Sequence, residues 1–383
     1  MSLVKESERF CDEIKDCWDS RILKKYSPLL QSLIKKIAKE NVGKSVLTNL
    51  INNLDIQSGL VDYLSGPTEL NVWRSESSKY PTVIYIFGES SHCNKLDCGK
   101  KGVKIEEYLG RMLKESPFFI DFYVELGLIL GDESCKQQAL SKEQTLYDIR
   151  NKFVNNLELY NGRIHFIDSR LIVGRERDKL SELDDYLRNL SYWGLDISSS
   201  GLPYSFMKFK KKFESLIFDF SRCYEVDDFI RIIFSNIRNN KLISKEIDRS
   251  DIDKKFLFSF FKKILDERLS VFTKSQFRDF RDWFYMIQNS YSFPRVEINL
   301  VSRILTPLVA IMVDIYTISR IFKKYKNKNF GPERAVNIIY YGGDGHSIII
   351  NKFLKELNFN ETWRSKYYET GCVDLKNIKQ PFF

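Results

Sequence analysis

Four short runs of apolar, β-branched and aromatic residues recur along the chain: Thr82–Phe87, Phe118–Val124, Arg163–Ile167 and Val336–Tyr341. Each run is followed at once by small or charged residues, which read "GESSH", "ELG", "DSR" and "GGDGH". Runs that are apolar on both faces are typical of parallel strands buried under helices on each side of a sheet. The pattern therefore predicts an α/β fold with a mainly parallel sheet flanked by helices.

Much of the remaining chain repeats Leu, Ile, Val and Phe at three- and four-residue spacing, as amphipathic helices do. This spacing predicts an N-terminal helical segment over residues 1–75, followed by an α/β domain over 76–383. A second helical stretch, at about 180–328, indicates a large insertion before the last strand. Ser65–Pro81 is rich in serine and contains two prolines, so we interpret it as a linker or crossing loop.

The first polar phrase, "GESSH", places Gly88, Glu89, Ser91 and His92 directly after a predicted strand. Ligands of open parallel sheets bind beyond the carboxyl ends of the strands, and Gly88 allows close approach of the backbone to a ligand. If a helix begins at this turn, Glu89 and His92 are neighbours that can form a general base or bind a divalent metal. The alternative is a capping Glu or Ser beside a histidine that serves only the structure.

The last polar phrase, "GGDGH", repeats this chemistry with Gly343, Asp344 and His346. The chain contains only three histidines, and two of them close these similar phrases. If the two strands are neighbours in the sheet, His92 and His346 face the same crevice. The pairing favours a functional interpretation of both phrases.

Charged residues also end the two middle strands. Glu125 ends "FFIDFYVE", and a carboxylate at the end of so apolar a strand is either paired with a cation or functional. In "RIHFIDSR", Asp168 and Arg170 share one face, and Arg170 can hold a carboxylate, a phosphate or a developing oxyanion. His165 points to the opposite face from Asp168, and we interpret it as structural.

One predicted helix carries polar residues inside an apolar sequence, "LVAIMVDIYTISR". Asp314 lies among aliphatic residues and therefore requires a partner. Tyr316 and Arg320 are one helical turn apart and can brace each other. A supporting role at the site and a purely structural network both fit these three residues.

The composition is that of a globular protein, with 43% hydrophobic and 14% aromatic residues in 383. The net charge of +9 is spread over short groups such as "KFKKKF", which we interpret as solvated helix faces. We therefore do not expect specific nucleic-acid binding. Seven cysteines at irregular spacing predict reduced thiols, with neither a disulfide framework nor a zinc site.

The N-terminus, "MSLVKESERFCDEIKDCW", carries charges throughout and lacks the apolar core of a signal peptide. Ile304–Ile318 is too short for a membrane span and contains Asp314. These features predict a cytoplasmic protein without a membrane span.

Several common catalytic motifs are absent from the sequence. There is no phosphate loop "GxxxxGK[ST]", no "HExxH" and no nucleophile elbow "GxSxG". "YGGDGH" is not a dinucleotide fingerprint, because no βαβ unit is expected to follow it near the C-terminus. These absences exclude the most familiar enzyme classes.

The order of the polar phrases resembles the superfamily of erythromycin esterases, ChaN-like haem-binding lipoproteins and TraB/Tiki-type proteases. "GESSH" has the Gly-Glu-x-x-His spacing of the erythromycin esterases, and "GDGH" fits a second Gly-x-x-His phrase. The resemblance implies that Glu89, His92, Glu125 and His346 are functional positions and that Arg170 supports them.

The chain also resembles uncharacterised proteins of large DNA viruses of amoebae and algae. The shared phrases read here "FGESSH", "DSR", "DIYTISRIF" and "YGGDGHSIIINKFLKELNF". Ser91-His92 stands where many of the viral proteins have His-Ser. If the protein is viral, its expected location is the host cytoplasm or the virion.

Two hypotheses follow. In the first, the protein hydrolyses an ester or amide bond of a small-molecule or peptide substrate, in a crevice that Glu89 helps to line. His92 activates water, directly or through a divalent metal held with Glu125 and His346, and Arg170 stabilises negative charge. In the second, the protein is a non-catalytic viral structural or host-interaction protein that uses the same fold as a scaffold.

Overall fold

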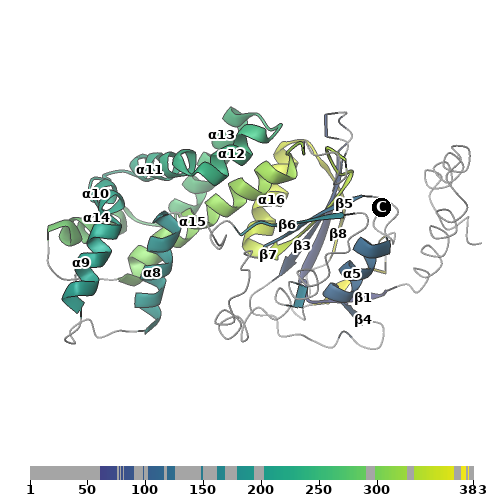
Figure 1. Cartoon of the computed structure of the whole chain (residues 1–383), viewed down its shortest axis with the longest axis horizontal. Helices are drawn as coiled ribbons and strands as arrows, with labels where there is room; N and C mark the ends of the chain where they lie inside the picture. Colours follow the sequence, from purple (N-terminus) through teal and green to yellow (C-terminus); the bar gives the residue numbers. More distant parts are fainter. Residues whose placement is uncertain are drawn as a thin grey trace, which may run out of the picture. The chain divides into compact units, whose positions relative to one another are not determined.

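A six-stranded mixed sheet forms the centre of the computed structural model (Figure 1). Across the sheet the strands lie in the order β6 (Gly162–Phe166), β5 (Ile120–Val124), β7 (Asn337–Gly343), β3 (Val83–Glu89), β2 (Glu69–Arg74) and β8 (Asn360–Arg364). The structure describes residues 61–75, 77, 79–80, 82–89, 98, 102–115, 119–125, 148–149, 162–168, 179–193, 202–289, 298–325, 332–365, 372–376 and 378.

The α/β architecture and the positions of the four predicted strands are confirmed, since they correspond to β3, β5, β6 and β7. The expectation of a mainly parallel sheet is wrong. The pairs β6–β5, β5–β7 and β7–β3 are parallel, but β2 runs antiparallel to both of its neighbours, β3 and β8. The sheet is therefore mixed.

The interpretation of Ser65–Pro81 as a loop is wrong for its central residues, which form β2. Leu70 and Val72 point into one hydrophobic cluster and Trp73 into the other, so the alternation of a strand is present between the flanking serines and prolines. Residues 61–75, which we assigned to the N-terminal helical segment, contain both β1 (Tyr63–Ser65) and β2. The remainder of that segment lies outside the described residues.

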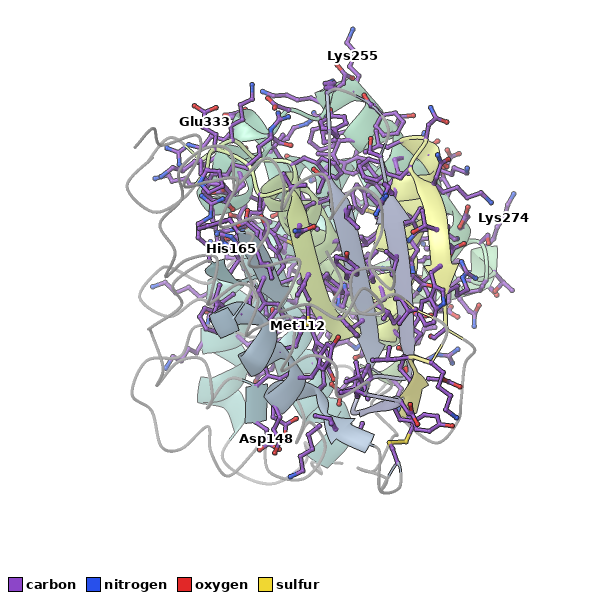
Figure 2. The ribbon with its side chains drawn as sticks, turned by 90° about the vertical axis from the view of Figure 1, so that its right-hand side faces the viewer. Met112, Asp148, His165, Lys255, Lys274 and Glu333 are labelled. Atoms are coloured by element: carbon purple, nitrogen blue, oxygen red, sulfur yellow. A yellow bond between two sulfur atoms is a disulfide. The ribbon has the colours of Figure 1, made fainter. Side chains whose placement is uncertain are left out.

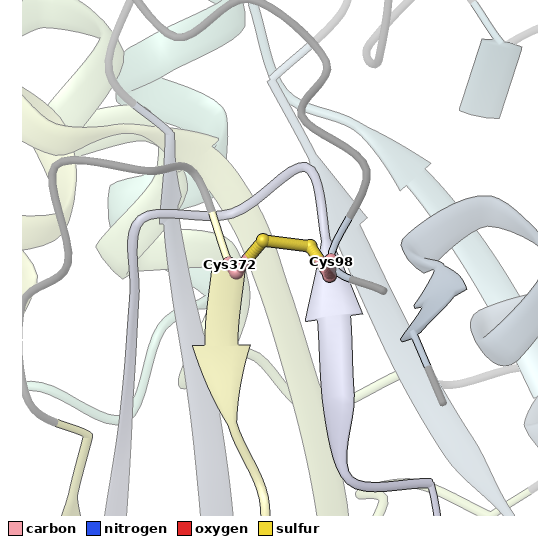
Figure 3. The surroundings of a disulfide bond; sticks show 2 residues. All are labelled: Cys98 and Cys372. Atoms are coloured by element: carbon pink, nitrogen blue, oxygen red, sulfur yellow. A yellow bond between two sulfur atoms is a disulfide. The ribbon is translucent and has the colours of Figure 1, made fainter. Parts of the chain in front are cut away.

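A second, three-stranded sheet has the order β4-β1-β9, with β4 at Gly102–Lys104 and β9 at Cys372–Asp374. β1 pairs with β4 in parallel and with β9 antiparallel. A disulfide bond joins Cys98 to Cys372 across a sequence separation of 274 residues (Figure 3). The expectation of reduced thiols is therefore wrong for this pair.

The two faces of the large sheet pack into different hydrophobic clusters. On the first face, called the α16 face, Ile84, Ile86, Tyr123 and Tyr340 pack together with α15 (Ile298–Ile321) and α16 (Asp344–Glu356). Because β3 is apolar at every position from Ile84 to Phe87, it can bury side chains on both faces.

On the opposite face, called the α5 face, Tyr85, Phe87, Phe122 and Tyr341 pack with α5 (Ile105–Glu115). Met112 of α5, which is labelled in Figure 2, belongs to this cluster. Helices therefore flank the sheet as expected.

Between β6 and β7 the chain forms the predicted helical stretch. α15 is the longest described helix of this stretch, and it packs against α8, α12, α13, α14 and α16. The helices that precede it are α8 (Lys179–Trp193), α9 (Leu202–Lys212), α10 (Glu214–Phe220), α11 (Val226–Asn239), α12 (Lys241–Arg249), α13 (Lys254–Leu269) and α14 (Lys274–Asn289).

By length and composition α15 passes the test for a helix that can cross a membrane, but 67% of its most apolar window is buried inside the structure. A core helix passes the same test. The absence of a membrane span remains a prediction.

Candidate functional site

Three titratable side chains from distant parts of the chain meet at the carboxyl end of the sheet. Glu125 directly follows β5, Asp314 lies on α15, and His346 lies in the first turn of α16. The Nδ1–H of His346 donates to Oδ1 of Asp314 over 2.5 Å, and Nε2 lies 3.1 Å from Oε1 of Glu125. The imidazole is therefore held between two carboxylates, and we call these three residues the carboxylate–histidine cluster.

The cluster is largely buried but reaches the surface on one side. The side chain of Asp314 is 1% exposed, whereas those of Glu125 and His346 are 11% and 13% exposed. Glu125 and His346 thus retain slight contact with solvent, while Asp314 holds the imidazole from the buried side.

Electrostatics favour the charged form of His346. Burial opposes a charge on the ring, but the two neighbouring carboxylates outweigh burial and raise the pKa of His346 to about 10. Both ring nitrogens then carry protons at neutral pH, so each donates to a carboxylate. Arg268 of α13 adds a second positive charge, with a guanidinium nitrogen 3.8 Å from Oδ2 of Asp314.

The backbone of the "GGDGH" phrase completes the cluster. The N–H of Gly343 donates to Oε2 of Glu125 over 2.7 Å, across 218 residues of sequence. A Cβ atom on Gly342 would overlap the hydroxyl of Tyr340 and lie 2.7 Å from Oε2 of Glu125. At Gly343 an added Cβ would lie 3.5 Å from Oε2 of Glu125, so Gly342 is the position of this phrase that more strictly requires glycine.

Asp344 does not join the cluster, although it is two residues from His346. Its Oδ1 lies 2.9 Å from the hydroxyl of Thr68 and faces the backbone of Gly88, where an added Cβ would be 2.7 Å away. Burial raises the pKa of the Asp344 carboxyl. Asp344 therefore lies beside β2 and β3 rather than in the carboxylate–histidine cluster, and its supporting role remains a prediction.

Glu89 also lies apart from the cluster. Its Oε2 accepts a hydrogen bond of 2.9 Å from the hydroxyl of Tyr341, a residue of the α5 face. Glu125 instead continues the alternation of Tyr123, which belongs to the α16 face. The sequence correctly placed both glutamates at strand ends, but the pleat of the sheet sends them to opposite faces.

Several predicted residues lie at the limit of the described chain. Asp168 follows β6 and is 5% exposed, so it is a buried strand-end carboxylate as expected. Ser91, His92 and Arg170 lie outside the described residues, so the predicted pairs His92–His346 and Asp168–Arg170 remain predictions.

Tyr316 and Arg320 belong to a separate buried network around His165. A guanidinium nitrogen of Arg320 donates to the hydroxyl of Tyr316 over 2.8 Å, and another donates to Nδ1 of His165 over 2.9 Å. Nε2–H of His165 donates to Asp121, which Arg163 also holds. Tyr316 and Arg320 thus brace each other as predicted, and the choice between a supporting and a purely structural role for them remains a prediction.

His165 is the opposite of His346 in its protonation. Burial is the largest cause that lowers the pKa of His165, to about 4, and the charges of Arg320 and Arg163 add to it. Its ring stacks on Tyr123, with centroids 4.4 Å apart. The residue is a neutral structural histidine, as the sequence indicated (labelled in Figure 2).

The described residues do not form a metal site by themselves. No group of three or more His, Cys, Asp and Glu among them is arranged to hold an ion. In addition, both ring nitrogens of His346 face carboxylates, so a metal would have to displace Glu125 from Nε2. The third predicted ligand, His92, lies outside the described residues, and we derive no step through a metal.

Two members of the neighbourhood escaped sequence reasoning. Arg268, beside Asp314, lies in an ordinary amphipathic helix, and Glu69, beside Asp344 and Gly88, lies in a segment that we interpreted as a loop. The need for a partner of Asp314 was predictable from its apolar surroundings, but the identity of that partner was not. It depends on how α15 and α16 pack.

Comparisons with protein-family models, with curated proteins and with solved structures find no match for this chain. The resemblances inferred from short phrases therefore remain predictions, and the function must be inferred from the geometry.

Proposed function

We propose that the protein hydrolyses an ester or amide bond at the carboxylate–histidine cluster. The observation that supports this proposal is the convergence of Glu125, His346 and Asp314 at the carboxyl end of the sheet, where only Asp314 is fully withdrawn from solvent. An acid–base pair oriented by a third buried group is the arrangement that general acid–base catalysis requires.

In the proposed reaction Glu125 is the base. It accepts a proton from a water molecule, the resulting hydroxide attacks the carbonyl carbon, and the proton then passes to the departing alcohol or amine. Oε1 and Oε2 of Glu125 are already oriented by His346 and by the N–H of Gly343. A positioned carboxylate avoids the entropic cost of arranging the base during the reaction.

His346 contributes its charge rather than its basicity. With a pKa near 10 it remains an imidazolium at neutral pH, fixed by Asp314. A fixed positive charge beside the point of attack stabilises the negative charge that develops on the carbonyl oxygen. Water activation by His92, with or without a divalent metal, is the alternative to Glu125 as the base, and anion stabilisation by Arg170 is compatible with either.

The test is hydrolysis of a panel of carboxylic esters and peptide amides by the wild-type protein and three variants. We expect Glu125→Gln and His346→Gln to lower kcat/KM by about 10²-fold to 10⁴-fold, the usual contribution of a general acid or base. Asp314→Asn removes only the orienting charge. This variant should lose less kcat/KM than the other two. The dependence of kcat/KM on pH should also shift, because the pKa of His346 falls towards its ordinary value.

Glu356→Gln is a matched control, because Glu356 forms an exposed ion pair with Lys263 outside the cluster. Full activity of both Glu125→Gln and His346→Gln would contradict the hydrolytic proposal. His92→Ala, measured on the same panel of substrates, tests the separate prediction that His92 activates water.

The second candidate is a non-catalytic viral structural or host-interaction protein. One specific observation favours it: His346 is engaged at both ring nitrogens, and such a buried ion network can serve structure alone. In that case the three variants lower stability, and the wild-type protein turns over no substrate of the panel.

The location of the protein remains a proposal as well. Disulfide bonds persist mainly in oxidising compartments, whereas the charged N-terminus led us to predict the cytoplasm. Counting free thiols in the protein isolated under alkylating conditions distinguishes the two environments.

A further inference from the structure

A groove of about 500 Å³ lies between α16 and the edge of the large sheet formed by β2 and β8. Its volume is within the range of roughly 300–1,000 Å³ that small-molecule sites occupy. Glu69, Asn71 and Trp73 of β2 line it on the α16 face, because they alternate with Leu70 and Val72 of the α5 face. The groove is separate from the carboxylate–histidine cluster.

The floor of the groove contains polar atoms without partners. Asn71 is 1% exposed, and its amide nitrogen and oxygen make no hydrogen bond of full geometry within the described part of the chain, although its amide lies close enough to the Glu69 carboxyl to lower the pKa of that group. Oε1 of Glu69 is likewise buried without a hydrogen bond to any described residue. Buried polar atoms without partners are costly, and a ligand seated in the groove would supply partners for these atoms.

The charge of the groove changes along its length. Burial is the main cause that raises the pKa of Glu69; Asp344 and Glu361 add to it, whereas Asn71 and Arg364 oppose it. This end of the groove therefore holds a carboxyl group and a carboxamide, which together offer donors and acceptors of hydrogen bonds. Arg364 of β8 lies opposite Asn71 in the register and supplies a cation that is paired with Glu361 over 2.6 Å.

The other end of the groove is basic and apolar. Trp73 donates its indole N–H to Asn351 of α16 over 2.7 Å, which places the following turn of the helix at this end. Lys352 and Lys355 lie on that turn and line the groove. Lys355 has no ion-pair partner among the described residues, and Lys352 makes only an exposed pair with Glu267.

The walls between the two ends are apolar. Trp73 and Phe359 are buried beneath the groove, and Ile348 lines it while remaining 50% exposed. Ile348 and Lys355 are seven residues apart on α16, which corresponds to about 10 Å along a helix. An elongated ligand with a flat middle can therefore contact both ends.

We propose that this groove binds a nucleoside monophosphate, with the base at Glu69 and Asn71 and the phosphate at Lys352 and Lys355. The carboxyl group and the carboxamide match the N–H donors and carbonyl acceptors on the edge of a base. The apolar walls suit the flat ring system, and the two lysines suit a phosphate.

The test is calorimetric titration of the full chain with AMP, GMP, CMP and UMP. Inorganic phosphate, ribose 5-phosphate and the free nucleosides serve as partial ligands. We expect at least one mononucleotide to bind at least tenfold more tightly than either its nucleoside or ribose 5-phosphate, because each partial ligand contacts only one end. Absence of saturable binding by all four mononucleotides would overturn the proposal.

Two variants test the two ends. Lys355→Glu reverses an exposed charge, should leave the folded structure intact, and should weaken mononucleotide binding at least tenfold. Lys274→Glu, at an exposed position of α14 that does not line the groove, is its matched control and should leave the dissociation constant unchanged. Equal effects of these two charge reversals would indicate attraction by net charge only and would contradict the site.

Asn71→Leu replaces the buried amide by an apolar side chain of similar size. Because the amide atoms lack partners, the variant should melt at the same or a higher temperature without ligand, yet lose the increase in Tm that the mononucleotide produces. Unchanged ligand stabilisation in a folded Asn71→Leu protein would show that the floor does not bind the base.

Discussion

The Nδ1–H of His346 donates to Oδ1 of Asp314 over 2.5 Å, and the opposite ring nitrogen lies 3.1 Å from Glu125. Burial alone would lower the pKa of this imidazole and leave the ring neutral. The two carboxylates outweigh burial and raise the pKa to about 10. In the unfolded chain the same histidine has the ordinary value of about 6.5. Folding and protonation of His346 are therefore coupled.

We expect the protein to lose stability between about pH 6.5 and pH 10. A pKa that is raised on folding contributes stability that is fully present below the unfolded value and is lost as the pH rises through the folded value. For His346 the contribution is on the order of 3 to 5 kcal/mol. Urea unfolding at a series of pH values measures it.

The comparison that isolates this effect is between wild-type protein and His346→Gln. Tyrosine ionisation near pH 10 affects both proteins alike, so the difference between their unfolding free energies reports on His346. The difference should shrink steadily from pH 6.5 to pH 10. A difference that does not depend on pH in this range would mean that His346 is not held as an imidazolium.

The buried network around His165 predicts the opposite behaviour at acidic pH. Burial and the charges of Arg320 and Arg163 lower its pKa to about 4, so the unfolded chain binds the proton more tightly. The folded state therefore loses about 3 kcal/mol of stability as the pH falls from 6.5 to 4.

NMR titration of the histidine ring signals checks this prediction directly. His165 should remain neutral at pH 5 in the wild-type protein. Arg320→Gln removes a nearby positive charge, and the pKa of His165 should rise if the variant remains folded. A histidine at position 165 that titrates near 6.5 in the wild-type protein would show that the ring is not buried in this network.

The sequence was sufficient for strands whose residues are apolar on both faces, but not for the edge of the sheet. β3 and β7 were predictable because nearly every position in each is buried. β8 reads "NETWR", and its pattern is mostly exposed, so no hydrophobic signal identifies it as a strand. β2 was not predicted, because the serines and prolines that flank it indicated a loop.

The candidate site was predictable as a set of residues but not as a set of contacts. Polar residues at strand ends identified Glu125 and His346, because α/β sheets bind ligands there. The contact between Glu125 and Gly343 exists because β7 lies between β5 and β3, and sequence patterns do not determine strand order. The separation of Glu89 from Glu125 similarly depends on the pleat of neighbouring strands.

Gly88 should tolerate a methyl group poorly. A Cβ atom there would lie 2.7 Å from Oδ1 of Asp344 and 2.8 Å from Cγ of Glu69. We expect Gly88→Ala to lower the free energy of unfolding by about 1 to 3 kcal/mol, the usual cost of overpacking. Thermal and urea unfolding measure the loss.

Gly345→Ala is the matched control for this substitution. Gly345 lies in the first turn of α16, and a Cβ atom there would have no heavy atom within 4 Å. Alanine is the better helix former, so this change should be neutral or stabilising by up to about 1 kcal/mol. Equal stability of Gly88→Ala and Gly345→Ala would contradict the close packing of the carboxylates around Gly88.

The disulfide between Cys98 and Cys372 should be a major source of stability, because it closes a sequence separation of 274 residues. It also ties β9 to the segment before β4 in a sheet whose described strands have three residues each. Removing a native disulfide typically costs about 2 to 5 kcal/mol. We therefore expect a reducing agent to lower the urea midpoint of the wild-type protein, and peptide mapping without reduction to recover the linked pair.

The double variant Cys98→Ser/Cys372→Ser separates this bond from every other effect of the reducing agent. It should unfold at the lower midpoint even without the reducing agent and should not respond to it, because the one other cysteine in the described part of the chain, Cys223, is a buried free thiol. Its stability should match that of the reduced wild-type protein, since both lack the same chain constraint. A wild-type midpoint that does not change on reduction would mean that the bond does not form in the folded protein in solution.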